Sequence, residues 1–213
     1  MMKHILRSVL ILAVAVSAML FTACESDNSI TDETPEETLI EKAQNFLTGD
    51  IVLNTKATKG GIDKTLLPGG CPTLFSFTWN KEGQVVIALR DFHVGTMPFA
   101  ITFLCRCKIM QLNYWEKNDY PEEGWIKFFG REGNVSTNGD EQQDNQEGSG
   151  ASVLGYYNVE THQIEFIIDY NMMLVRTETL LQEVDKSRTP NFKEEFAKYE
   201  KELAEYKKEH GYN

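Results

Sequence analysis

The spacing of hydrophobic residues changes along this chain from a helical period to a strand period. After Thr34 and Pro35, apolar residues recur on one helical face: Leu39, Ile40, Ala43, Phe46 and Leu47. Thr34 can cap a helix, proline suits its first turn, and Gly49 suits its end. A short amphipathic helix is therefore predicted before residue 49.

From about residue 50 to residue 177, alternate residues are apolar, which is typical of strands with one buried face. The alternating sets are 51–55, 75–79, 85–89, 101–109, 125–129, 151–157, 163–170 and 172–177. The connection 80–83 has the length and the final glycine of a hairpin turn, and the polar, acidic segment 134–150 is expected to be a loop. Short strands with no long helix between them predict a mainly β fold, with an antiparallel sheet closed into a barrel or folded into a sandwich.

A second helix is predicted after Thr189 and Pro190. Its stripe recurs in steps of four and three residues: Phe192, Phe196, Tyr199, Leu203 and Tyr206. This narrow stripe, flanked by Glu and Lys, favours an amphipathic C-terminal helix packed on the sheet over a two-chain coiled coil, which needs more heptads. The segment 178–187 fits either a strand end or a helix.

The first 23 residues have the order of a secretory signal peptide. Lys3 and Arg7 precede the apolar run 9–16, which is too short for a membrane span. The ending Leu-Phe-Thr-Ala-Cys at 20–24 resembles a lipobox, in which the cysteine becomes the lipidated first residue. We therefore expect a signal peptide at 1–23 and lipidation at Cys24; a secreted soluble protein is the alternative.

The residues after Cys24 are too polar to bury, so 24–33 is expected to be the lipidated cysteine and a flexible acidic tether. Its start, Glu-Ser-Asp-Asn at 25–28, resembles the acidic signal of surface-displayed lipoproteins of the Bacteroides type, although an ordinary spacer fits as well. The remainder, 34–213, is long enough for a single domain.

The charge of the chain restricts its partners. It has 21 Lys and Arg against 32 Asp and Glu, a net charge of −11, and the signal contains two of the cations and no acid. Nucleic acid is excluded as a partner, because a protein meets it with Lys and Arg. The membrane attachment is then the lipid on the N-terminus, without a polybasic contact.

Two segments within the strand region resemble a known family. They are Gly-Gln-Val-Val-Ile-Ala-Leu-Arg-Asp-Phe at 83–92 and Gly-Thr-Met-Pro-Phe-Ala-Ile at 95–101. With the lipobox, the tether and the short helix, they resemble the calycin-like β-barrel domains of Bacteroides-type outer-membrane lipoproteins. The resemblance implies an antiparallel calycin-like β-barrel. The Gly-x-Trp signature of true lipocalins is missing at Gly49, so their ligand cup is not implied.

Three cysteines remain once Cys24 is assigned to lipid. Cys105 and Cys107 share a strand face, where a bond between them would be strained, whereas Cys71 is expected in a loop. We predict a disulfide between Cys71 and one of the other two, because an exported protein meets oxidising conditions. Three buried thiols are the alternative, and no metal is predicted, since Cys-x-Cys without a spaced His pair is weak evidence for zinc.

Catalytic chemistry has little support in the sequence. Asp91 and His93 lie on one strand face, where an acid can orient an imidazole base, but no recognisable nucleophile motif accompanies them. Four aromatic residues around Pro121 are predicted either to cap the core or to stack on a sugar: Tyr114, Trp115, Tyr120 and Trp125. No catalytic residue and no cofactor is predicted.

These observations favour a lipid-anchored, non-catalytic binding or accessory module at the bacterial outer membrane, on its cell-surface or periplasmic face. Its ligand or partner, whether a protein, a small molecule or a glycan, is not named by the sequence. The alternative is a hydrolase that acts on a glycan or a peptide.

Overall fold

The computed structural model describes residues 37–94, 99–137 and 150–212. The predicted signal peptide, the lipidation site Cys24 and the tether lie outside these described residues. No helix within them is long and apolar enough to cross a membrane.

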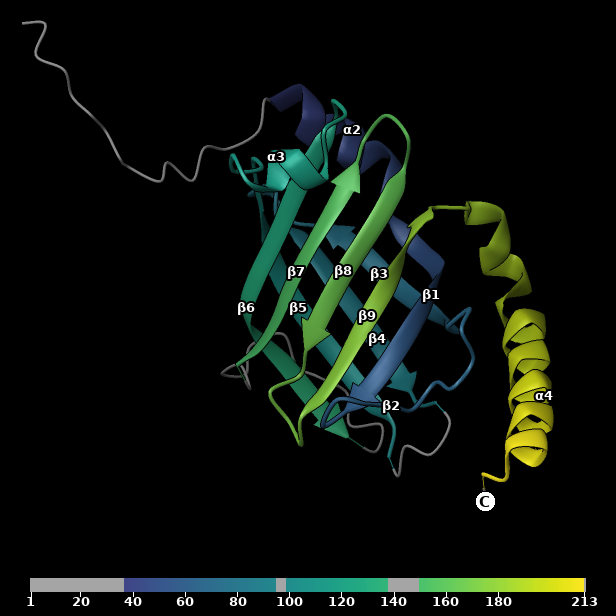
Figure 1. Ribbon diagram of the computed structural model, residues 1–213. Helices are drawn as coiled ribbons and strands as arrows, with labels where there is room; N and C mark the ends of the chain where they lie inside the picture. The colour runs from purple at the N-terminus through teal and green to yellow at the C-terminus, as the bar shows by residue number, and fades with distance from the viewer. Residues whose placement is uncertain (1–36, 95–98, 138–149, 213) are drawn as a thin grey trace, which may run out of the picture. The chain divides into compact units, whose positions relative to one another are not determined.

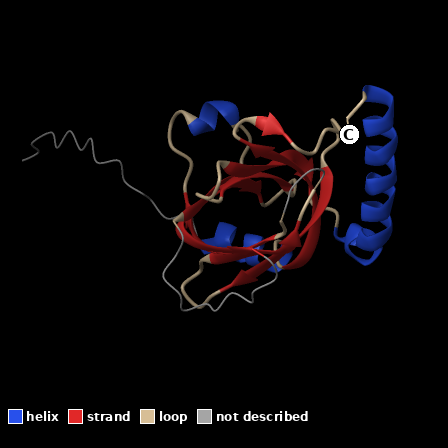
Figure 2. Cartoon of the chain, turned by 90° about the horizontal axis from the view of Figure 1, so that it is seen from below, coloured by secondary structure: helices blue, strands red, loops and turns tan. Residues whose placement is uncertain are grey.

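Eight long antiparallel strands form a closed barrel (Figures 1 and 2). They are β1 (Gly49–Lys59), β3 (Cys71–Trp79), β4 (Val85–Phe92), β5 (Ile101–Met110), β6 (Trp125–Thr137), β7 (Ala151–Asn158), β8 (Gln163–Asp169) and β9 (Val175–Glu183). Each of them pairs with the next in this order, and β9 pairs with β1 from Thr55↔Thr179 to Lys59↔Val175, which closes the ring. The short β2 (Ile62–Asp63) folds back on the end of β1. The predicted β-barrel is therefore confirmed, and the sandwich alternative is wrong.

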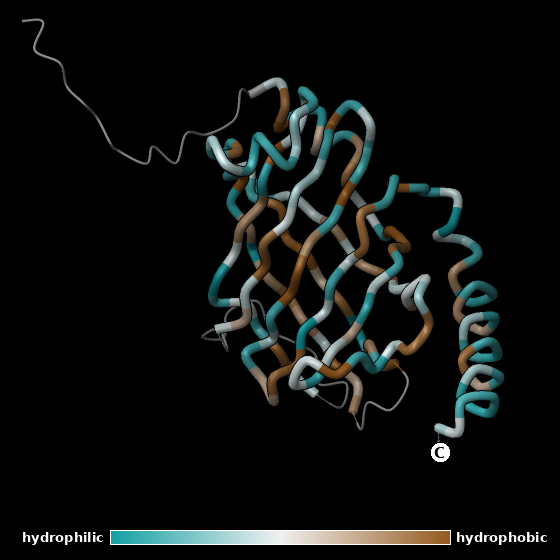
Figure 3. Tube along the Cα trace, viewed as in Figure 1, coloured by the Kyte–Doolittle hydropathy of each residue, from teal (hydrophilic) through white to brown (hydrophobic). Residues whose placement is uncertain are grey.

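The inward residues of the strands fill the barrel. Alternation of apolar and polar residues along the strands is visible in Figure 3 and places one set of side chains in the core. Rings of Phe75 and Phe166 meet edge to face at 5.0 Å. Gly155 leaves room for an aromatic ring, because a Cβ there would lie 2.3 Å from Cζ of Phe128. The interior is thus a packed core rather than a ligand cup.

Several strands deviate from the expected ranges, and β3, for example, begins at Cys71 rather than at residue 75. β6 continues to Thr137, into the segment predicted as a loop, and a register shift between Gly130 and Gly133 interrupts its alternation. β9 begins at Val175 and continues to Glu183, so the ambiguous segment after residue 177 starts as a strand. A bulge hides the period of two, which is why the pattern underestimated the length of β6.

The predicted N-terminal helix is α2 (Glu37–Phe46), at one end of the barrel (Figure 1). Ala43 and Leu47 are fully buried in the core cluster. The indole Nε1 of Trp79 donates a 2.7 Å hydrogen bond to the carbonyl of Leu47. These contacts hold α2 against the end of the barrel.

The C-terminal helix lies outside the ring of strands (Figure 2). A 3₁₀ turn, η1 (Lys186–Asn191), leads into α4 (Phe192–His210), which ends at Gly211 in the left-handed conformation. Tyr199 and Leu203 of its apolar stripe are buried. The helix thus packs on the sheet as predicted. A single-turn helix, α3 (Glu116–Asp119), was not predicted.

Candidate functional site

A groove on the outer face of the barrel lies between α4 and strands β3 and β4, with a volume of about 540 Å³. We call it the α4 groove. Its apolar floor includes Leu74 and Ala88, and its aromatic side consists of Phe192 and Phe196. Its polar lining includes Asp50, Arg90, Asp91 and His93. A volume of this size is typical of ligand pockets.

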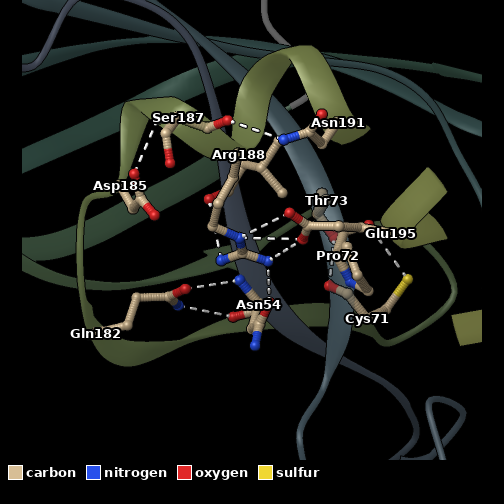
Figure 4. Close-up of polar contacts among 11 residues, drawn as sticks. Asn54, Cys71, Pro72, Thr73, Gln182, Asp185, Ser187, Arg188, Asn191 and Glu195 are labelled. Atoms are coloured by element: carbon tan, nitrogen blue, oxygen red, sulfur yellow. Dashed lines mark hydrogen bonds and ion pairs between the residues drawn. The ribbon is translucent and has the colours of Figure 1, made fainter. Parts of the chain in front are cut away.

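Arg188 joins η1 to both α4 and β1 (Figure 4). Its guanidinium donates to Glu195 in α4 at 2.7 and 3.0 Å and to Oδ1 of Asn54 in β1 at 2.8 Å. The side-chain amide of Gln182 in turn accepts from the backbone N–H of Asn54 at 2.9 Å and donates to the backbone carbonyl of Asn54 at 3.0 Å. A planar, multidentate cation therefore links the first turns of α4 to the barrel.

Further hydrogen bonds secure α4 to the barrel. The hydroxyl of Thr189 donates to the carbonyl of Asp50 at 2.8 Å. Farther along α4, the buried hydroxyl of Tyr199 donates to the carbonyl of Thr65 at 3.0 Å. Burial raises the pKa of Tyr199, so this phenol stays a donor over the physiological range.

Asp91 and His93 both line the groove, but the structure does not join them. Asp91 lies in the bulge of β4 with φ of 49°, and its N–H donates to the Thr102 hydroxyl at 3.3 Å. The His93 ring instead lies 6.4 Å from that of Phe196. Among the described residues no hydrogen bond or ion pair links the acid to the imidazole, and no group of three His, Cys, Asp or Glu could hold a metal.

The predicted disulfide is not formed, since Cys71, Cys105 and Cys107 are all free and buried. Cys71 lies in β3 rather than in a loop. Cys105 in β5 is level with Phe77 in β3, because Phe77 pairs with Ile87 of β4 and Ile87 pairs with Cys105. Cys71 is six residues from Phe77, roughly 20 Å along the strand at about 3.3 Å per residue, well beyond disulfide reach. The arrangement corresponds to the alternative of three buried thiols.

The environments of two of the thiols lower their reactivity. Burial raises the pKa of Cys71 to about 12. Contact with Cys105 and burial together raise the pKa of Cys107. Because the thiolate is the reactive form, Cys71 and Cys107 are poor nucleophiles at neutral pH.

The four aromatic residues divide into a packed pair and an exposed pair. Tyr120 packs on Trp125 with ring centroids 4.7 Å apart and stacks on Tyr156 at 4.3 Å. Tyr114 and Trp115 are 73% and 75% exposed. Core-capping therefore explains the first pair and not the second.

The groove could not have been recognised in the sequence. Its aromatic side was expected to belong to an ordinary packing stripe, and Arg188 has no distinctive neighbouring motif. Phe192 and Phe196 belong to the same stripe as Tyr199 and Leu203, and only the structure shows that the latter two are the buried ones.

Comparison with known proteins identifies a family. The sequence model of a protein family described as a domain of unknown function (DUF4903) matches residues 24–211. No curated protein and no solved structure matches the chain.

Proposed function

The chain belongs to the DUF4903 family, and we propose that it is a lipid-anchored, non-catalytic binding module at the bacterial outer membrane. The observation that carries this proposal is a packed barrel interior combined with the α4 groove on its outer face. Contact with a ligand would then occur on the outside of the barrel, beside α4.

The lining of the α4 groove suits a segment of a partner protein. Its aromatic and aliphatic surface supplies the apolar contact on which such recognition depends. Its polar lining carries both charge signs, with Arg90 close in sequence to Asp91. A mixed lining of this kind favours a polypeptide with an apolar side chain between polar neighbours over a strongly charged ligand.

The membrane location rests on the sequence. The lipobox ending at Cys24 and the resemblance to Bacteroides-type lipoproteins support an outer-membrane anchor. The nine residues that follow Cys24, as a flexible coil, would reach roughly 15 to 18 Å. Such a tether would hold the domain near the membrane while leaving it free to meet a neighbouring membrane protein.

Site-specific photo-crosslinking in the native membrane tests the proposal. A benzophenone amino acid at Ser76 lies in the α4 groove, whereas the same probe at Thr78 lies two residues farther along β3, outside the groove lining. We expect one defined protein adduct from position 76, lost in Phe196→Ser, and none from position 78. The same adducts from both positions, or adducts that survive Phe196→Ser, would contradict the proposal.

A hydrolase of a glycan or a peptide is the second candidate, because Asp91 and His93 line one groove. Both side chains are exposed, so Asp91→Ala and His93→Ala can each be made to separate turnover from binding. Turnover of a glycan or peptide by the purified protein, abolished by either substitution with stability unchanged, would favour the enzyme.

A further inference from the structure

The exposed aromatic pair, Tyr114 and Trp115, lies at one end of the barrel. It belongs to the connection between β5, which ends at Met110, and β6, which begins at Trp125. Since neighbouring strands alternate in direction, the end of β5 and the start of β1 lie at the same end of the barrel, which we call the α2 end (Figure 1). In the part of the chain that the structure describes, only Leu174 is a more exposed large apolar side chain. Packing in the core therefore does not explain this pair.

Contacts link the connection 111–124, which carries the pair, to α2. The turn between β7 and β8 lies between them. The N–H of Val159 in this turn donates to the carbonyl of Gly124 at 2.9 Å. In the same turn, Glu160 pairs with Lys42 of α2 at 2.5 Å. The connection and α2 are thus neighbouring parts of one surface at the α2 end.

The turn that carries the pair is attached to the wall of the barrel. Oδ1 of Asn113 accepts from the backbone N–H groups of Trp115 and Glu116, both at 2.9 Å. The carboxylate of Glu116 in turn accepts from Lys127 of β6 at 2.8 Å and from the Tyr156 hydroxyl of β7 at 2.9 Å. The rings are therefore presented outward on an ordered turn, which lowers the entropy cost of binding.

The chemistry of the pair suits a membrane–water interface. Trp and Tyr combine an apolar ring with a polar N–H or O–H, and both are enriched at the level of the lipid headgroups. The exposed charged residues that follow the pair are one cation and three carboxylates: Lys117, Asp119, Glu122 and Glu123. Attraction to anionic headgroups is not expected from this set, so the contact would depend on the rings.

The start of the described chain places the α2 end nearest to the predicted lipid. Glu37 begins α2 and lies 13 residues after Cys24. Those residues would span at most about 45 Å if fully extended, and about 20 Å as a flexible coil. The opposite end of the barrel is farther by the 11 residues of β1, about 36 Å of strand. A lipid at Cys24 would therefore hold the α2 end beside the bilayer.

We propose that Tyr114 and Trp115 insert into the headgroup region of the bilayer and orient the barrel with its α2 end toward the membrane. This inference rests on the proposed lipid anchor. The two rings add a second membrane contact, which converts a flexible attachment into a defined orientation. Neither ring lines the α4 groove, so the groove stays free for its partner.

Quenching of tryptophan fluorescence by brominated lipid tests the proposal. The protein is purified from membranes with its lipid and reconstituted in phosphatidylcholine vesicles. Bromine near the headgroup should quench Trp115 more than bromine near the chain ends, because an interfacial ring stays shallow. Trp115→Phe should abolish this quenching, since it leaves only the less exposed Trp79 and Trp125. Added phosphatidylglycerol should not increase it.

A tryptophan at the opposite end of the barrel is the matched control. Leu174 is exposed there, and its carbonyl accepts from the N–H of Gly60, just after β1, at 3.0 Å. Leu174→Trp in the Trp115→Phe background should show no quenching by either lipid. In the native membrane, a benzophenone amino acid at position 114 should form lipid adducts. Thermal unfolding of each variant confirms that the fold is intact.

The outcomes separate this inference from the anchor on which it rests. Vesicle-bound protein with no quenching of Trp115, or with equal quenching of the tryptophan at position 174, would overturn the inference and leave the anchor standing. A defined protein adduct from position 114, without lipid adducts, would assign the pair to a protein partner and overturn it as well. Protein that does not float with vesicles and has no lipid on Cys24 would overturn the anchor, and this inference with it.

Discussion

Replacement of Arg188 by alanine should weaken the packing of α4 on the barrel. Within the described part of the chain, Arg188 is the only residue of η1 that hydrogen-bonds both Glu195 in α4 and Asn54 in β1. A hydrogen bond to a charged group contributes about 1.5–3 kcal/mol, and the pair with Glu195 is 22% and 30% exposed, so solvent screening reduces this. We expect a loss of about 2 kcal/mol, concentrated in α4.

Hydrogen exchange of the α4 amides measures this loss of stability. About 2 kcal/mol corresponds to roughly 30-fold faster exchange of the α4 amides if they exchange by local opening, with little change in the barrel strands. Arg188→Lys keeps the charge but loses the planar guanidinium. Its α4 exchange rate should therefore lie between those of the parent protein and Arg188→Ala. The photo-crosslink from Ser76 should weaken in parallel, because α4 forms one side of the groove.

Arg176→Ala is the matched control for Arg188→Ala. Arg176 pairs with Asp169 through one 3.1 Å contact, with side chains 55% and 44% exposed, so its removal should cost less than about 0.5 kcal/mol. Equal effects of the two substitutions, or unchanged α4 protection in Arg188→Ala, would refute the assigned role of Arg188.

The remaining predictions concern the core, the thiols and the anchor. Gly155→Ala should destabilise the protein by about 1–3 kcal/mol in urea unfolding, because its Cβ would clash with Phe128, whereas Gly69→Ala, with open space around it, should have little effect. Alkylation without reductant should label Cys71, Cys105 and Cys107 in the denatured protein, and a single labelled thiol would restore the disulfide. In the native protein Cys71 should stay unreactive at neutral pH and gain reactivity only toward its pKa of about 12, since the thiolate is the reactive form. Cys24→Ala should release the protein from the membrane fraction, and the absence of lipid mass on the parent's Cys24 would contradict the anchor.

The sequence alone was sufficient for features that depend on neighbouring residues. Alternation along β7 and β8 predicted those strands closely, and the helical stripe from Leu39 to Leu47 predicted α2. Both periods follow from local backbone geometry, which determines which residues of a helix or strand face the core. The same reasoning predicted that α4 packs by its apolar stripe.

Tertiary structure decided everything that joins distant residues. Barrel closure depends on the pairing of Thr55 with Thr179, and no local pattern distinguishes it from a sandwich. The α4 groove depends on β3 and β4 lying side by side next to α4, which brings Ser76, Ala88 and Phe196 together. Cys71 was separated from Cys105 for the same reason, because strand register fixes distances that sequence spacing does not contain. Local periodicity thus determined which face each residue takes, while register and closure, which depend on long-range pairing, determined which residues meet.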